Sequence, residues 1–209
     1  MKKHGITREA HIAHEKNKFS QGKWENTINR KDQRIHDSKI IKDNFEENIK
    51  KVLCIGARHE SEIEDLQLNF DYVVGIDIVD APGIKRVDAH DLCNYFPENS
   101  FDIVYASHSL EHMVEPEKVL LNIRKVAKLG CFISLPIFSK TYNSHCSLFD
   151  ICQFLDENKE SILDESFVTD SVFKNQTLLK DFDSLGNIEI TYFRISSNLK
   201  EFSMLFKWL

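Results

Sequence analysis

Residues 51–60 read KVLCIGARHE, and residues 72–80 read YVVGIDIVD. Each stretch contains a short apolar run with several β-branched residues and then passes into a polar turn. Parallel strands that are covered by helices on both faces have this pattern, because neither face of the strand meets water. The two stretches therefore predict two buried strands of an α/β domain, Val52–Ile55 and Tyr72–Ile76.

The next two apolar runs, Ile103–Ala106 and Cys131–Leu135, predict two more strands of the same kind. A helix is predicted between them, because Pro116 suits a first helical turn and is followed by one apolar stripe, formed by Val119, Leu120, Ile123, Val126 and Ala127. Gly130 stands where a cap at the carboxyl end of that helix is expected. Strand, helix and strand at this spacing predict right-handed crossovers and a parallel sheet.

The two ends of the chain follow other patterns. Residues 1–36 are polar and are predicted to form an N-terminal extension, so that the globular domain covers residues 37–209. Ile41, Phe45 and Ile49 are apolar and spaced by four, which predicts a helix at the start of that domain. Asp37 or Ser38 is expected to cap this helix. Near the other end, two runs joined by a loop predict an antiparallel strand pair at one edge of the sheet, Asn187–Arg194 and Phe202–Trp208.

The charge distribution distinguishes the beginning of the chain from the rest. The 209 residues fit one α/β domain with a short appendage, and the formal net charge is −6. Residues 1–51 carry 13 Lys/Arg against 8 Asp/Glu, whereas the remainder carries 14 against 25. A basic arm could attract an anionic substrate or nucleic acid, but its mixed signs favour a solvated helical extension.

The cysteines and the hydropathy pattern predict a soluble, cytoplasmic protein. The five cysteines form no C-x-x-C pair, which argues against a zinc site and a disulfide framework and for reduced thiols. The N-terminus lacks the apolar stretch of a secretory signal, and no apolar run approaches the roughly 20 residues that cross a bilayer. We therefore expect no metal and no membrane, and the oligomeric state stays open.

Polar residues follow the carboxyl end of each predicted parallel strand. Open α/β sheets bind their ligands at these strand ends. Gly56 follows the first strand, at a turn that permits a close approach of the backbone to a ligand. Asp77 follows the second strand, 21 residues beyond Gly56, about where an acidic residue commonly holds ribose hydroxyls. Two further polar turns lie at residues 87–91 (VDAHD) and 107–112 (SHSLEH).

Five segments, taken in order, resemble the motifs of class I S-adenosylmethionine (SAM) dependent methyltransferases of the type-11-like group: KVLCIGARHESE, VVGIDIVD, VDAHDL, FDIVYASHSLEH and VLLNIRKVAKLGCFISLP. The resemblance covers roughly residues 50–137, and the predicted C-terminal strand pair matches the sheet edge of that family. It implies a Rossmann-like, seven-stranded, mostly parallel sheet with an antiparallel C-terminal pair and helices on both faces. It also implies SAM as cofactor and transfer of its methyl group to an acceptor by in-line displacement.

The resemblance further implies which residues meet the cofactor. Those expected around the methionine part of SAM are Gly56, Ala57, Arg58, Ser107 and His108. Those expected around the nucleoside are Asp77, as acceptor from both ribose hydroxyls, with Ile78, Asp88, Ala89 and His90. His108 is the first candidate for a base that deprotonates the acceptor, because its turn would face the transferred methyl group, and His145 is the second.

The glycine motif of the family is altered in this chain. Cys54 stands where the family has an acidic residue, and Arg58 and Glu60 replace two glycines. We expect Arg58 to pair with the SAM carboxylate, and Glu60 or Glu62 to meet the SAM ammonium in place of the missing acid. A bulky, acidic loop is poorly suited to the pyrophosphate of a dinucleotide, which argues against a nicotinamide-dependent dehydrogenase.

The roles of the remaining histidines and the identity of the acceptor follow less directly from the sequence. His112 is interpreted as a structural helix residue, and the cluster of His4, His11 and His14 as solvated side chains rather than a metal site. A small-molecule acceptor is expected, with a nucleic acid kept open. The altered glycine loop also keeps a second class open, a catalytically inactive SAM-binding or scaffold protein with the same fold.

Overall fold

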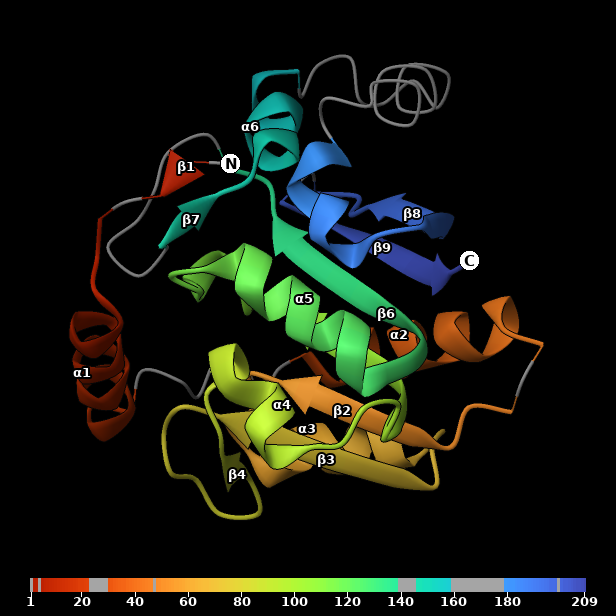
Figure 1. Cartoon of the computed structure of the whole chain (residues 1–209), viewed down its shortest axis with the longest axis horizontal. Helices are drawn as coiled ribbons and strands as arrows, with labels where there is room; N and C mark the ends of the chain where they lie inside the picture. Colours follow the sequence, from red (N-terminus) through yellow and green to blue (C-terminus); the bar gives the residue numbers. More distant parts are fainter. Residues whose placement is uncertain are drawn as a thin grey trace.

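The computed structural model describes residues 2–3, 5–22, 30–46, 48–138, 146–158, 179–198 and 200–209 (Figure 1). Within these residues, seven strands form one sheet in the order β4-β3-β2-β5-β6-β9-β8. In chain order they are β2 (Lys51–Ile55), β3 (Tyr72–Asp77), β4 (Lys85–Arg86), β5 (Phe101–Ser107), β6 (Ala127–Pro136), β8 (Ile188–Ile195) and β9 (Glu201–Trp208). A separate antiparallel pair joins β1 (Lys2–Lys3) to β7 (Ser147–Leu148).

Helices connect these strands and cover the sheet. The described helices are α1 (Arg8–Ser20), α2 (Lys31–Asn44), α3 (Glu60–Gln67), α4 (Leu92–Tyr95), α5 (Pro116–Val126) and α6 (Asp150–Glu157), with 3-10 turns η2 (Ala89–Asp91), η3 (Leu110–His112) and η5 (Lys180–Leu185). α5 lies on one face of the sheet and α2 and α3 on the other (Figure 1). Successive residues of β2 alternate between the two resulting cores, because Leu53 packs on the α5 side and Val52 on the α2 side. This two-sided burial explains the continuous apolar run of the strand.

The sheet confirms the predicted architecture. β2 pairs in parallel with β3 on one side and with β5 on the other, and β5 pairs in parallel with β6. β9 pairs antiparallel with both β6 and β8, as the terminal strand pair predicted. The strand order therefore reverses between β2 and β5, and open sheets of this kind bind ligands at the carboxyl ends of such a strand pair.

The helix that precedes β2 begins and ends earlier than the sequence predicted. It runs over Lys31–Asn44, and Asp37 and Ser38 lie buried within it instead of capping it. Arg34 of this helix donates two hydrogen bonds to Asp65 of α3, at 2.9 and 2.7 Å, so polar contacts as well as apolar ones hold α2 in place. The prediction rested on Ile41, Phe45 and Ile49. All three are buried, but only Ile41 lies in the helix.

The predicted helix cap at Gly130 is also wrong. α5 ends at Val126, and Ala127 already has an extended backbone with ψ 131°, so the chain enters β6 directly. Gly130 lies within β6 beside β9, where an added Cβ atom would collide with the carbonyl oxygen of Phe206. The close approach of the neighbouring strand, rather than a helix end, requires this glycine.

The N-terminal extension packs against the rest of the chain. Arg8, the first residue of α1, forms ion pairs with Asp88 and Asp91 at the turn η2. The predicted boundary between residues 36 and 37 falls inside α2, and the division into an extension and a domain stays a prediction. None of the helices in the described part of the chain is long and apolar enough to cross a membrane.

Candidate functional site

A cavity of about 440 Å³ opens at the carboxyl ends of β2, β3 and β5. Its volume lies within the usual range of small-molecule sites, roughly 300–1,000 Å³. Ala57 is fully buried and belongs to the core on the α2 side. The other residues that the sequence predicted for the cofactor all line the cavity: Gly56, Arg58, Asp77, Ile78, Asp88, Ala89, His90, Ser107 and His108.

The turn after β2 depends on the glycine at position 56. Gly56 has φ +79°, a conformation that side chains rarely adopt, and an added Cβ would lie 2.8 Å from the Cβ of Ser109. The amides of Gly56 and Ala57 both donate to the carbonyl of Ile76, at 2.8 and 3.1 Å. The glycine therefore lets this turn pack closely against the loop after β5, at the floor of the cavity.

Of the two acids expected to replace the missing one, Glu62 lines the cavity and Glu60 does not. Glu62 accepts hydrogen bonds from the backbone amides of Arg58 (2.8 Å) and His59 (3.1 Å) and completes a capping box at the start of α3. Glu60 is exposed. Glu62 thus stabilises the helix start, and Glu60 faces solvent.

Arg58 links two buried carboxylates across the cavity. Its Nη2 lies 2.5 Å from Oε2 of Glu15 in α1, and its Nε lies 3.5 Å from Oδ2 of Asp77. The other oxygen of Asp77 accepts a hydrogen bond of 2.9 Å from the amide of Val79. Burial raises the pKa of Asp77 above its usual value, and the charge of Arg58 offsets only part of this effect.

Asp88 organises the next turn. Its Oδ1 accepts from the amide (2.9 Å) and from Nδ1 (2.6 Å) of His90, and its Oδ2 accepts from Nε of Arg8 at 2.6 Å. Burial would raise the pKa of Asp88, but these hydrogen bonds from His90 and Arg8 outweigh burial and hold it well below its usual range. Nε2 of His90 accepts from the amide of Glu115 at 3.1 Å, so both ring nitrogens are engaged by the protein.

His108 occupies a strained position directly after β5. Its φ is +50°, which is unusual outside glycine and costs roughly 1–3 kcal/mol. Its amide donates to the carbonyl of Ser134 at 2.9 Å, and its Nε2 lies 2.8 Å from Oε2 of Glu201 in β9. The hydrogen bond from His108 lowers the pKa of Glu201, which also pairs with Arg30 at 3.1 Å.

Sequence reasoning missed the contribution of the N-terminal arm. Six cavity residues come from α1, α2 and the residue before α2: Arg8, His11, Glu15, Arg30, Gln33 and Arg34. The excess of basic residues before position 51 was the only signal, and it did not say where the arm lies. Glu201 was missed as well, because it belongs to a strand that is 93 residues from His108.

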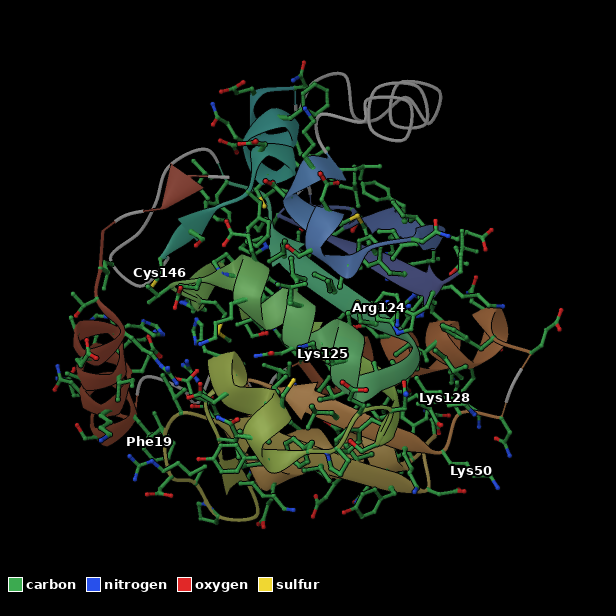
Figure 2. The ribbon with its side chains drawn as sticks, in the orientation of Figure 1. Phe19, Lys50, Arg124, Lys125, Lys128 and Cys146 are labelled. Atoms are coloured by element: carbon green, nitrogen blue, oxygen red, sulfur yellow. The ribbon has the colours of Figure 1, made fainter. Side chains whose placement is uncertain are left out.

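The histidines of the arm and the loops differ from their predicted settings. His11 is buried rather than solvated, and its Nδ1 lies 3.4 Å from the sulfur of Cys146, which Figure 2 shows close to α1. Burial lowers the pKa of His11 and raises that of Cys146 to about 11. His112 lies in the 3-10 turn η3 and lines the cavity. His4 and His145 lie outside the described residues.

Comparisons with known proteins agree with this geometry. A family model described as a methyltransferase domain, of type 11, matches residues 53–135. The structure is similar to a SAM-dependent methyltransferase from Archaeoglobus fulgidus (TM-score 0.55, 14% identity, covering 85% of this chain and 94% of that one). It is also similar to one from Aquifex aeolicus (TM-score 0.51, 13% identity, 82% and 88%). A sequence search among curated proteins finds no significant match.

The sheet order and the cavity at its switch point define a Rossmann-like fold of the class I methyltransferase type. Residues 53–135 match the model of the type 11 methyltransferase domain, and the chain has the fold that the similar SAM-dependent methyltransferases share. SAM is the cofactor of this family. The cyclase SpnF also shares the fold, at a TM-score of 0.50, 10% identity and coverage of 83% of this chain and 80% of that one, so the fold alone does not define the reaction.

Proposed function

We propose that this chain transfers the methyl group of SAM to an acceptor that enters the cavity at the carboxyl ends of β2 and β5. The observation that carries the proposal is the convergence of Gly56, Asp77 and His108 on one cavity at the switch point of the sheet. The sulfonium of SAM activates the methyl group, so the protein has mainly to position the two reactants. The acceptor is proposed to be a small molecule, given the volume of the cavity.

The residues present fit the cofactor. Asp77 offers a buried carboxylate at the end of β3, where it would accept from both ribose hydroxyls, and Ile78 beside it would pack on the adenine. Asp88 and Ala89 would meet the adenine edge, on a turn that two hydrogen bonds from Asn122 to the carbonyls of residues 89 and 90 hold in place. Because both ring nitrogens of His90 are engaged, its role is to support this turn.

The opposite end of the cavity would hold the methionine part and the acceptor. The backbone of Gly56 and Arg58 and the turn at Ser107 would border the methionine part. His108 would accept the proton of an oxygen or nitrogen acceptor, as general base. Glu201 would act as a positioning residue, since its carboxylate at 2.8 Å orients the imidazole from behind.

One observation favours a second function, that of a SAM-binding or scaffold protein without catalysis. Arg58 already pairs with Asp77, the residue expected to hold the ribose. A ligand hydroxyl that binds there has to share Asp77 with the guanidinium or displace it. The altered glycine loop is the source of this competition, because a glycine at position 58 would leave Asp77 open.

Calorimetric titration with SAM and with S-adenosylhomocysteine tests the cofactor, and turnover of SAM with a panel of small acceptors tests catalysis. We expect micromolar binding of both ligands and formation of S-adenosylhomocysteine with at least one acceptor. Binding without turnover, also with nucleic acid and protein acceptors, would support the scaffold function. Absence of binding at millimolar ligand would refute methyl transfer from SAM and would leave only a scaffold that does not bind SAM. The cytoplasmic location stays a prediction from the sequence.

A further inference from the structure

The carboxylate of Glu111 is buried at the wall of the cavity without a full set of partners. Glu111 lies in η3, lines the cavity and is only 1% exposed. Its Oε2 has no hydrogen-bond partner among the described residues. Its other oxygen, Oε1, lies 3.7 Å from Nδ1 of His108 and 3.8 Å from Nε2 of His112. Both distances are longer than a hydrogen bond.

An unpaired buried carboxylate is costly for a folded protein. Leaving a buried polar group unsatisfied costs roughly 1–3 kcal/mol, and more when the group is charged. Burial accordingly raises the pKa of Glu111, and His108, a hydrogen bond from the residue's own backbone amide and more distant arginines offset this only in part. Such a group is expected where a cation arrives with a ligand and completes the hydrogen bonds.

The altered glycine motif lacks the acidic residue that would meet the ammonium group of SAM. Cys54 stands in place of the acid of this motif and lines the cavity. Burial raises the pKa of its thiol and so keeps the thiol protonated. Glu62 is used in the cap of α3, and Glu60 is exposed. Glu15, the other buried glutamate of the cavity, is paired with Arg58 and Lys18. Among the described glutamates at the cavity, Glu111 is the one with a buried oxygen that lacks a hydrogen-bond partner.

We propose that Glu111 binds the ammonium group of the methionine part of SAM, in place of the acid that the glycine motif lacks. The inference rests on the proposed function, since it needs SAM in this cavity. The unsatisfied Oε2 would receive an N–H of the ligand, and the ligand charge would offset the buried carboxylate charge. The site thereby stores part of its binding energy as an unsatisfied group in the free protein.

The test compares two ligands on two proteins by calorimetry. S-adenosylhomocysteine carries the ammonium, whereas 5′-methylthioadenosine lacks the whole amino-acid part. For Glu111→Gln we expect affinity for S-adenosylhomocysteine to fall about tenfold or more and affinity for 5′-methylthioadenosine to stay within about twofold. The free variant should unfold at the same temperature as the wild type or higher, because the uncompensated charge is removed. Glu111→Met, which fills similar space without polar atoms, should behave in the same way.

Other outcomes overturn the proposal. Unchanged affinity for S-adenosylhomocysteine would show that Glu111 does not meet the ammonium, while the wild-type titration would still support the proposed function. An equal loss for both ligands, or a clear drop in the unfolding temperature, would show a structural role. Glu62→Gln is the matched control: it keeps an acceptor for the cap of α3 but removes the charge that faces Arg34 at 3.8 Å, so it should lower the unfolding temperature. If the wild type binds neither ligand, the proposed function fails and this inference fails with it.

Discussion

The carboxylates around the cavity fall into two groups that differ in how the protein compensates them. Asp88 and Asp77 face arginines, Arg8 and Arg58, and both arginines are tied to the N-terminal arm. Glu111 at the cavity and Asp37 behind it have no lysine or arginine at ion-pair distance within the described part of the chain. The first group is ion-paired with arginine before any ligand arrives, whereas the second group has no ion pair with lysine or arginine.

This difference predicts opposite consequences for stability and binding. At the paired carboxylates a ligand has to share or displace an existing partner, so removing the carboxylate harms the protein and the ligand complex together. At the unpaired ones, removing the charge relieves the free protein, and any ligand that needed the charge loses affinity. Substitutions at the two groups can therefore separate residues that hold the fold from residues that wait for a ligand.

The largest effect is expected for the paired carboxylate of β3. Asp77→Ala should weaken binding of SAM by about a hundredfold or more, because two charge-assisted hydrogen bonds to the ribose are lost. It should also lower the unfolding temperature, since Arg58 keeps only Glu15 as its partner. Calorimetry and thermal unfolding measure the two effects. Asp80→Ala, three residues further on and exposed, is the control, and a loss of affinity below about threefold would contradict the role of Asp77.

The unpaired carboxylate of α2 should change stability with pH. The side chain of Asp37 accepts only from neutral groups, the hydroxyl of Tyr105 and the amide of Gln33, and burial raises its pKa to about 6. Because the folded pKa lies above the unfolded value of 3.8, the protonated carboxyl favours folding. Its contribution is complete below about pH 4 and is lost as the pH rises through about 6.

Asp37→Asn should therefore be more stable than the wild type near pH 8, by up to about 3 kcal/mol, and equally stable near pH 4. The asparagine oxygen can still accept from Tyr105, and Gln33 can turn its amide to suit. Urea unfolding at several pH values measures the difference. A variant whose stability falls further below that of the wild type as the pH rises from 4 to 8 would show that Asp37 is needed as an ion.

The two groups also differ in how far the sequence predicted them. Asp77 is the last residue of the buried strand β3, and Asp88 follows the short strand β4 by two residues. The carboxyl ends of parallel strands meet at one edge of the sheet, so the positions of both residues follow from local patterns. Arg8, the partner of Asp88, comes from a helix that lies 80 residues away in the sequence. No periodicity indicates where such a polar helix docks, because the docking depends on ion pairs that form only in the folded chain.

The same reason accounts for the errors around α2 and Gly130. A buried polar contact such as Arg34 with Asp65 counts as surface in a search for apolar stripes, so the helix start was placed too late. Gly130 was read as a cap because it follows an apolar helix, yet the neighbouring strand β9 decides its role. Local periodicity predicted the sheet, and contacts between distant segments determined the details of the site.

A smaller effect is expected at Glu201, which pairs with the proposed base His108. Glu201→Gln removes the charge that orients His108 but keeps a side chain of the same size. We expect kcat to fall about tenfold, with affinity for SAM nearly unchanged, because a positioning residue acts on the base and not on the cofactor. Glu189→Gln on the exposed side of β8 serves as the control. A loss of SAM affinity with kcat unchanged would instead place Glu201 in cofactor binding.

The smallest effect, and the sharpest test of the comparison, concerns Arg58. If Arg58 turns from Asp77 to the SAM carboxylate on binding, Arg58→Ala should weaken SAM several-fold, by roughly 1 kcal/mol, and should weaken 5′-methylthioadenosine much less. The net loss is small because the wild type first has to break the contact of Arg58 with Asp77. Calorimetry with both ligands measures this difference, and Lys85→Ala at an exposed position is the control. A gain of affinity for both ligands would mean that Arg58 mainly competes with the ribose for Asp77, and the paired end of the cavity would then restrain binding rather than assist it.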